Sequence, residues 1–399
     1  VVFDGSGVAN GLLKSFVVSS PSLLTFYNLN VDMTDLHSGD GYDGAYVEFQ
    51  DAVAVANDLR IIDGYLDEGS IDLGGNLYLD FTNANRKAER RGSTRVLFHS
   101  GGNQQIFASD QGVFAPAIDV DNGTTVSPGA GTTTFGLSFL NMQSGSFNSP
   151  TGDLVFYDWL SEGATQLEGI NITGGTFNHN NGHVKVLYSG SANWTHKIIF
   201  KLADPAGLTL NHLTVGIVDR HSGGNYDDVV FEIAAGHNLV LAGNLYLEDG
   251  QLDGGSIELA GDLYLGYTDA AQKAEIDGTT VIRFNDSGSH EIHSTQADAC
   301  GPVIEVSNGS TVTAAAGTTD FSIEKLVILG GNFTGPTGVL SFSGRLPDSQ
   351  SQIDGFTVNG GTFTHNNGTV KVNRIGGGNG GGWWKAKIGR ASCRERVEV

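Results

Sequence analysis

Apolar and polar residues alternate over short stretches along most of this chain. In residues 238–247 and 256–265, apolar side chains largely alternate with polar or small ones, and Gly-Asn or Gly-Asp dipeptides interrupt the alternation. A period of two over about four to six residues, bounded by turn-forming residues, predicts short β-strands. Helical periodicity is nearly absent, and only residues 81–91 and 267–276 form charged stretches that contain Ala. We expect a protruding loop or a short helix at these two places.

Nearly the same long sequence occurs twice along the chain. Residues 175–186 return as residues 361–372, which is an offset of 186 (361 − 175 = 186). Within each copy the pattern Gly-x-Phe-x4-Gly-x-Φ-x-Φ, where Φ is apolar, also recurs, and it begins at Gly145, Gly175, Gly331 and Gly361. Self-similarity at a long period is the signature of a repeat array, so we expect short equivalent units and not two unrelated domains.

These offsets set the predicted organisation of the chain. We place repeat 1 at residues 2–185, repeat 2 at 186–371 and the start of a third repeat at 372–386, so the chain is expected to be a piece of a longer array. Residues 387–399 are basic in an acidic chain and follow neither copy. They resemble the translation of a common sequencing adapter, and we interpret them as an artefactual tail.

Many short strands are compatible with two architectures. In a parallel β-helix, each coil of about 20–25 residues climbs by one strand spacing of about 4.8 Å, and equivalent side chains stack in ladders. Tandem β-sandwiches would instead form domains of about 100 residues. The sequence has no Tyr-corner signature and no Pro-rich linker between the copies. We therefore predict an all-β, right-handed parallel β-helix (a β-solenoid) with about eight coils per repeat, and tandem β-sandwich domains are the alternative.

The charge balance narrows the range of partners. The 22 basic and 44 acidic residues give a net charge of −22, which disfavours nucleic acid and anionic membranes as partners. No apolar run approaches the ~18 residues of a membrane span, so we expect no direct membrane insertion of this segment. Cys393 lies in the tail and Cys300 aligns with Phe114, which predicts a core residue and neither a disulfide framework nor a zinc site.

Two acidic pairs recur in both copies and are the first candidates for chemistry. Asp63 and Asp67 match Asp249 and Asp253, and each pair lies along a Gly-rich turn. Carboxylates placed in this way can bind Ca²⁺, the one cofactor that the sequence suggests. Asp is also frequent in turns, because it tolerates the left-handed region and caps its own backbone. The sequence lacks the calcium-binding nonapeptide repeat, and this favours the turn role.

A second recurrent cluster lies in a short loop that is present in both copies. Its members are His37, Tyr42, Asp43, His221, Tyr226 and Asp227, and the loop returns at an offset of 184 (221 − 37 = 184). Side chains of these types serve as proton-transfer groups or metal ligands. A surface turn with a hydrogen-bonding His explains the same pattern, and the replacement of Asp40 by Gly224 in the second loop weakens the case for a metal.

Two His and two Trp residues are weaker candidates. His179 and His365 occupy His-Asn-Asn-Gly turns, in which we expect Asn at positive φ and a structural His. Trp159 and Trp194 are candidates for stacking on sugars, although Trp194 aligns with a glycine in the second copy. The sequence contains no nucleophile elbow, P-loop or metalloprotease helix.

The repeated strings resemble the repeats of large secreted bacterial surface proteins. Residues 243–247, 254–259 and 361–372 carry this resemblance, which is to β-solenoid adhesins of the autotransporter and filamentous-haemagglutinin kind. The resemblance implies an extracellular or cell-surface location, associated with the outer membrane, and a fragment of a larger protein.

A structural and adhesive function is therefore expected. The chain would act as a rod that presents weak contacts to glycans or proteins of a host, a surface or a matrix, and these contacts would gain by avidity. The alternative is a carbohydrate-active enzyme, a polysaccharide lyase or hydrolase built on a β-helix. Such an enzyme needs paired carboxylates, or Arg or Lys beside acidic ligands, in one groove. The sequence reveals no catalytic cluster specific to one copy, so we predict no enzyme activity.

Overall fold

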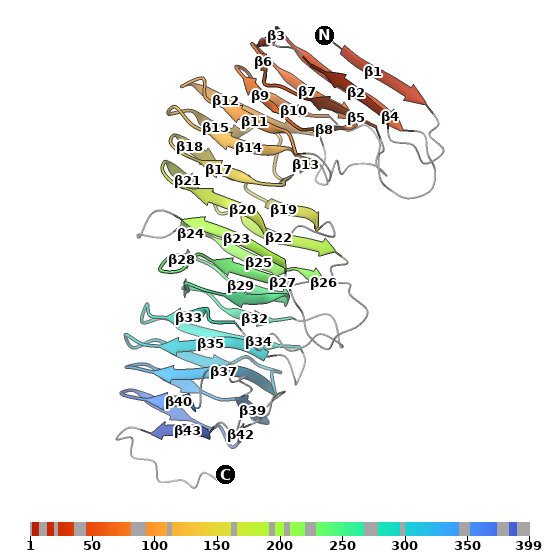
Figure 1. Ribbon diagram of the computed structural model, residues 1–399. Helices are drawn as coiled ribbons and strands as arrows, with labels where there is room; N and C mark the ends of the chain where they lie inside the picture. Colours follow the sequence, from red (N-terminus) through yellow and green to blue (C-terminus); the bar gives the residue numbers. More distant parts are fainter. Residues whose placement is uncertain are drawn as a thin grey trace. The chain divides into compact units, whose positions relative to one another are not determined.

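The chain is built from parallel β-strands. A computed structural model describes residues 2–7, 14–19, 23–35, 45–80, 93–109, 114–160, 166–190, 196–202, 208–219, 229–266, 278–295, 300–342, 352–372 and 383–388. Every regular element within these ranges is a strand, and the pairings between described strands are parallel (Figure 1). The strands form long sheets stacked as in a β-helix, so the predicted all-β parallel β-helix is confirmed. Tandem β-sandwiches are excluded, because their sheets consist of antiparallel strands.

The chain divides into two compact units. Unit 1 comprises Val1–Trp159, Glu168–Tyr188 and Lys201–Asp204. Unit 2 comprises Leu160–Leu167, Ser189–Phe200 and Pro205–Val399. Each unit has its own buried apolar core.

The strands of unit 1 lie along three sides of the coils. Sheet 1 consists, in order of pairing, of β1 (Val2–Gly7), β4 (Leu29–Asp35), β7 (Leu59–Asp63), β10 (Leu77–Leu79), β12 (Asn103–Ala108), β15 (Thr125–Pro128), β18 (Ser146–Asn148) and β21 (Thr176–Asn178). Sheet 2 contains β3 (Leu24–Phe26), β6 (Val53–Val55), β9 (Ser70–Leu73), β11 (Arg95–Phe98), β14 (Ala117–Val120), β17 (Leu140–Met142) and β20 (Gln166–Ile172). The third side is formed first by β2 (Lys14–Val18), β5 (Ala45–Phe49) and β8 (Tyr65–Asp67), and then by β13 (Phe114–Ala115), β16 (Phe135–Leu137), β19 (Asp153–Leu160) and β22 (His183–Gly190).

Unit 2 contains strands at equivalent positions. Sheet 1′ consists of β25 (His212–Gly216), β29 (Leu245–Asp249), β32 (Leu263–Leu265), β34 (Ser289–Ser294), β36 (Thr311–Ala314), β38 (Asn332–Thr334) and β41 (Thr362–Thr364). Sheet 2′ consists of β24 (Leu208–Leu210), β28 (Asn238–Leu241), β31 (Ser256–Leu259), β33 (Val281–Phe284), β35 (Cys300–Val306), β37 (Phe321–Ile328), β39 (Val339–Phe342), β42 (Thr369–Val372), β40 (Gln352–Val358) and β43 (Trp383–Ile388). The remaining strands are β23 (His196–Leu202), β26 (Val218–Asp219), β27 (Val229–Ile233) and β30 (Gln251–Asp253).

Coil lengths vary within a unit and recur between the units. Along sheet 1 from Leu59 onwards, paired positions in successive coils differ by 18, 29, 22, 21 and 30 in the sequence (for Leu59 and Leu77, 77 − 59 = 18). Along sheet 1′ from Leu245 onwards, the series is again 18, 29, 22, 21 and 30. The expected length of about 20–25 residues fits only part of this series. The second coil of each series contains residues 81–92 or 267–277, so the loop or short helix expected there lies outside the described residues.

Stacked apolar side chains fill the inside of the coils. In sheet 2, Phe98 pairs with Val120, and both side chains are fully buried. In sheet 2′, Phe284 pairs with Val306 at the equivalent place, again with no exposed surface. Burying one such side chain stabilises a fold by about 1.5–3 kcal/mol. The repeated ladders of these residues therefore supply the main stabilisation of both units.

The Gly-x-Phe pattern marks a close approach between neighbouring coils. Gly175 has a φ of 88°, and a Cβ at this position would lie 2.6 Å from the carbonyl oxygen of Gly145 in the preceding coil. Two positions further on, Phe177 stacks on Phe147, with their ring centroids 5.8 Å apart. Gly is required where the backbones meet, and Phe fills the space beside them.

The His-Asn-Asn-Gly turns adopt the expected backbone in both copies. Asn180 and Asn181 have φ values of 51° and 58°, and Asn366 and Asn367 have values of 52° and 59°. In the first turn, the ring Nδ1 of His179 accepts a hydrogen bond of 3.0 Å from the backbone N–H of Asn181. This contact gives the His the structural role that the sequence predicts.

The last described strand reaches into the segment predicted to be an artefactual tail. β43 ends at Ile388, and its residues Lys387 and Ile388 pair with Thr357 and Val358 of β40. The described sheet therefore ends slightly later in the chain than the predicted boundary after residue 386. Residues 389–399 lie outside the described residues.

Candidate functional site

The first member of each predicted acidic pair is buried and caps its own turn. Asp63 and Asp249 expose only 4% and 3% of their surface. Each Oδ1 accepts a hydrogen bond from the backbone N–H of the next residue, at 3.1 Å from Gly64 and 3.0 Å from Gly250. This geometry is that of an Asp which stabilises a tight turn.

The second member of each pair fastens the returning chain to the preceding coil. Asp67 Oδ1 accepts hydrogen bonds from the backbone N–H and the hydroxyl of Ser93, at 3.0 and 2.9 Å. Asp253 Oδ1 accepts the equivalent pair from Thr279, at 3.2 and 2.6 Å. In the described part of the chain, no group of three or more His, Cys, Asp and Glu side chains is placed to hold a metal ion. Calcium binding by these residues stays a prediction, and turn and loop fastening is their observed role.

Several other candidates lie outside the described residues. The recurrent loop cluster of His37, Tyr42, Asp43, His221, Tyr226 and Asp227 falls in such segments, as does Trp194. For Cys300 and Trp159 the structure places the backbone in a strand and does not describe the side chain. Their predicted roles are not tested.

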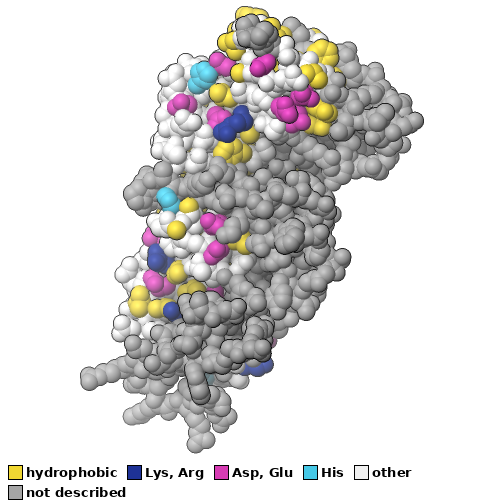
Figure 2. Space-filling model, viewed as in Figure 1, with side chains coloured by type: hydrophobic (Ala, Val, Ile, Leu, Met, Phe, Trp, Pro, Cys, Tyr) yellow, Lys and Arg dark blue, Asp and Glu magenta, His cyan; other side chains and the backbone are white. Residues whose placement is uncertain are grey.

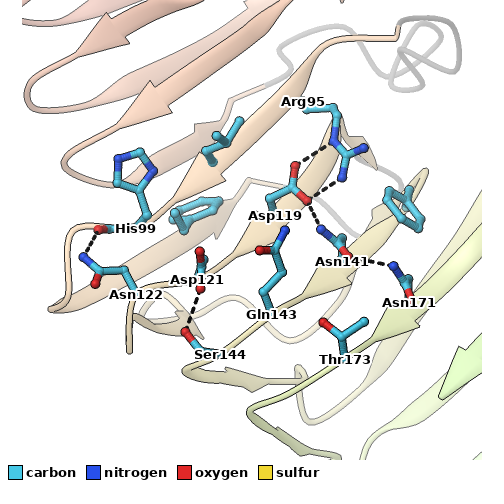
Figure 3. Close-up of a pocket in the computed structure, with 13 residues that line it drawn as sticks. Arg95, His99, Asp119, Asp121, Asn122, Asn141, Gln143, Ser144, Asn171 and Thr173 are labelled. Atoms are coloured by element: carbon cyan, nitrogen blue, oxygen red, sulfur yellow. Dashed lines mark hydrogen bonds and ion pairs between the residues drawn. The ribbon is translucent and has the colours of Figure 1, made fainter. Parts of the chain in front are cut away.

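The described residues contain a groove that the sequence did not reveal. It has a volume of about 900 Å³ and lies on the outer side of sheet 2 in unit 1 (Figure 3). Strands β11, β14, β17 and β20 form its floor. We call it the sheet 2 groove, and its lining residues are Arg95, Leu97, Phe98, His99, Asp119, Asp121, Asn122, Phe139, Asn141, Gln143, Ser144, Asn171 and Thr173.

Parallel register arranges the outward side chains in two columns. Leu97 pairs with Asp119, Asp119 with Asn141, and Asn141 with Asn171, so these four residues form the first column. Side chains two positions further along each chain point to the same side. They form the second column, which consists of His99, Asp121, Gln143 and Thr173.

A continuous chain of polar contacts crosses the first column. The Nε and Nη2 atoms of Arg95 donate to the two carboxylate oxygens of Asp119, at 2.6 and 2.5 Å. The Asn141 amide donates to Asp119 Oδ1, and the Asn171 amide donates to Asn141 Oδ1 at 3.0 Å. The Arg95 guanidinium also lies 5.2 Å from the ring centroid of Phe139, which is a cation–π distance. The charges of this column are thus paired within the protein.

The second column is held by hydrogen bonds at its edge. Ser144 Oγ donates to Asp121 Oδ1 at 2.7 Å, and this bond, together with the Asn122 backbone N–H, lowers the pKa of Asp121 below its ordinary value of 3.8. His99 Nε2 lies 3.0 Å from Asp72 Oδ1. A glycosidase needs a carboxylic acid with a raised pKa as proton donor. Asp121 has the opposite shift, so it lacks the property expected of that proton donor.

The equivalent face of unit 2 keeps the backbone and changes the chemistry. Its first column reads Arg283, Glu305, Val327 and Thr357, in the same register. Here Arg283 Nε lies 3.4 Å from Glu305 Oε1. Both units thus neutralise the acidic residue of the column, but valine replaces the central amide in unit 2.

The groove was missed because its residues form no local motif. The positions of Asp119, Asn141 and Asn171 differ by 22 and by 30 (141 − 119 = 22; 171 − 141 = 30). These spacings are coil lengths, and only the coil lengths reveal that the three side chains share a column. The site could have been found by a search for polar residues that are separated by coil lengths and are replaced in the second copy.

Comparisons with protein-family models, with curated proteins and with solved structures find no match to this chain. Among the residues that the structure describes, no helix has the length and apolar character required to span a membrane.

Proposed function

We propose that this chain is a structural and adhesive segment of a repetitive bacterial surface protein. It acts outside the cell as a stack of β-helical coils that presents weak, repeated contacts to glycans or proteins of a host, a surface or a matrix. The observation that carries the proposal is that both copies retain the residues that build coils, whereas one outer face differs between them. A scaffold requires this kind of duplication, because each coil needs the same inner ladder and turns.

The coil-building contacts support this view in detail. Asp67 with Ser93, and Asp253 with Thr279, make the same hydrogen bonds at equivalent places. On the surface, Figure 2 shows basic side chains lying close to acidic ones, with apolar side chains nearby. Mixed surfaces of this kind suit contacts that are individually weak and gain by avidity.

One observation favours the alternative of a carbohydrate-active enzyme. The central amides of the sheet 2 groove, Asn141 and Gln143, are not repeated on the described equivalent face of unit 2, and an active site is expected to be singular. The groove also places Arg95 beside Asp119, two residue types that such enzymes use. The charges of Arg95 and Asp119 already neutralise each other, however, and Asp121 has a lowered pKa. Adhesion remains the better-supported function.

One experiment separates the two functions. The full chain is coupled to beads at several densities and exposed to a panel of soluble polysaccharides and matrix proteins. Binding and newly formed reducing or unsaturated sugar ends are measured in parallel. We expect retention that rises steeply with bead density, without new chain ends. Depolymerisation that is abolished by Asp121→Asn would establish the enzyme instead, and absence of retention across the panel would contradict the adhesive function.

A further inference from the structure

We propose that the sheet 2 groove of unit 1 binds one extended strand of an uncharged polysaccharide, which runs across β11, β14, β17 and β20 from coil to coil. This inference rests on the proposed adhesive function and names the ligand class for one site. The spacing, the charge pairing and the hydrogen-bonding capacity of the groove support it.

The two columns form a ladder of evenly spaced polar groups. Neighbouring parallel strands are about 4.8 Å apart, so successive rungs are separated by that distance along the groove. This spacing is close to the length of one hexose unit in an extended glycan chain. A polymer lying along the columns would therefore bring each sugar against a new rung. The exposed rungs are Gln143 and Thr173 of the second column. Asn141 of the first column is buried, and its amide is already bonded to Asp119 and Asn171.

Charge pairing favours an uncharged ligand. The fork of Arg95 is occupied by both oxygens of Asp119, so it does not offer its bidentate face to a carboxylate or sulfate. Asp121 accepts the hydroxyl of Ser144, and the chain as a whole has a net charge of −22. An anionic polymer would be repelled by the charge of Asp121 and of the chain, so the groove favours an uncharged polymer over an anionic one.

The remaining groups match the hydroxyls of sugars. An amide offers two donors and one acceptor oxygen, and a hydroxyl offers one donor and two lone pairs. The amide of Gln143 has no hydrogen-bond partner within the described residues, and the side chain is exposed. It lies between Asp121 and Asn141 in the open part of the groove (Figure 3). Leu97 and Phe139 add apolar surface at the same site, against which the C–H faces of a sugar can pack.

Unit 2 supplies a matched reference within the same chain. Val327 and Leu329 occupy the positions of Asn141 and Gln143, on strands with the same register. The apolar side chains remove the amides without changing the coil. A glycan should therefore bind unit 1 and not the equivalent face of unit 2.

The test uses two polymers with the same β-linked backbone. The full chain is run in native gels that contain either uncharged hydroxyethyl cellulose or anionic carboxymethyl cellulose. We expect the uncharged polymer to retard the wild-type chain and the anionic polymer not to do so at low salt. Two variants install the residues that unit 2 carries. One is the single variant Gln143→Leu, and the other is the double variant Asn141→Val with Gln143→Leu. Both variants should bind at least about tenfold more weakly than the wild type.

Two controls make the result decisive. Leu329→Ala changes the equivalent face of unit 2 and should leave retardation unchanged. The exposed single variant Gln143→Leu should keep the thermal midpoint of the wild type, so that loss of binding is not loss of folding. Equal retardation of wild type and double variant, or salt-sensitive retardation by the anionic polymer alone, would overturn the inference. If the bead assay shows retention of other partners while hydroxyethyl cellulose does not bind, the ligand assignment fails and the adhesive function stands.

Discussion

Unit 1 and unit 2 share their inner residues and differ on one outer face. Phe147 and Phe333 occupy equivalent positions and are both fully buried. Asn141 and Val327 also occupy equivalent positions in the strand register, but Asn141 belongs to a polar network and Val327 is apolar. Inward positions are constrained by close packing, whereas outward positions need only be compatible with a strand. The two units therefore separate residues that build the coil from residues that are free to acquire a binding function.

A second pair of equivalent positions, Gln104 and His290, shows how a buried polar position changes between the units. Gln104 donates to the carbonyl of Gly75 at 2.6 Å, and at the equivalent place the ring Nδ1 of His290 lies 3.0 Å from the carbonyl of Gly261. The other polar atom of each side chain also has a partner. Ser100 donates to Oε1 of Gln104 in unit 1, and Nε2 of His290 pairs with Asp286 in unit 2. A buried polar residue and its partner thus change together, because an unpartnered polar group would destabilise the coil.

The largest expected effect tests whether the inner ladders are equivalent. Phe147→Ala and Phe333→Ala should each lower the free energy of unfolding by about 3–5 kcal/mol, because each leaves a cavity in a packed core. Urea denaturation of the full chain, followed by circular dichroism, measures both. Leu329→Ala is the control, since that side chain is 43% exposed and its loss should cost less than about 0.5 kcal/mol. A large difference between the two Phe variants would break the equivalence.

A smaller effect should distinguish the two ion pairs. Asp119→Ala removes a two-bond contact to Arg95 and the acceptor of Asn141, and we expect a loss of about 1–2 kcal/mol. Glu305→Ala removes one contact of 3.4 Å on a partly exposed surface and should cost less than about 1 kcal/mol. Urea midpoints of the two variants, measured side by side, check this order. The reverse order would show that the groove network contributes little to folding.

The smallest effect concerns acid stability and the position of His290. Burial acts to raise the pKa of Asp286, but hydrogen bonds from the Gly288 N–H and the His290 ring outweigh it, and the net pKa is lowered below its ordinary value of 3.8. Stabilisation from a carboxyl with a lowered pKa is complete above the unfolded value and is lost as the pH falls through the folded value.

The variant Asp286→Ser with His290→Gln installs the pair found in unit 1 and should lose less stability in acid than the wild type does. Urea midpoints at about pH 6 and about pH 3 give the comparison. Asp121 also has a lowered pKa, and its contribution cancels because it is present in both proteins. Parallel loss in the two proteins would contradict a role for Asp286.

The β-helix was predictable because its signals are local or periodic. Alternating apolar residues define strands, and Gly and Asn define turns such as that at Asn180 and Asn181, where positive φ was expected and is observed. Coil lengths were less predictable, because loops between strands lengthen at little cost in closure entropy. A uniform coil of about 20–25 residues was therefore too simple.

The candidate site was harder to predict than the fold. Asp63 and Asp67 stood out because they recur, and recurrence selects residues that build coils. Asn141 and Gln143 did not stand out, because they are absent from the second copy and belong to no motif. In a duplicated chain, the site was found where the copies disagree.

The sequence by itself determined the repeat, the strands, the inward residues and the turns, because each of these depends on neighbours a few residues away or on a fixed offset. Only the tertiary structure decided which outward side chains meet. Arg95, Asp119 and Asn141 become neighbours through strand register between coils of unequal length. Register depends on how much chain each loop takes up, and no local pattern records that quantity.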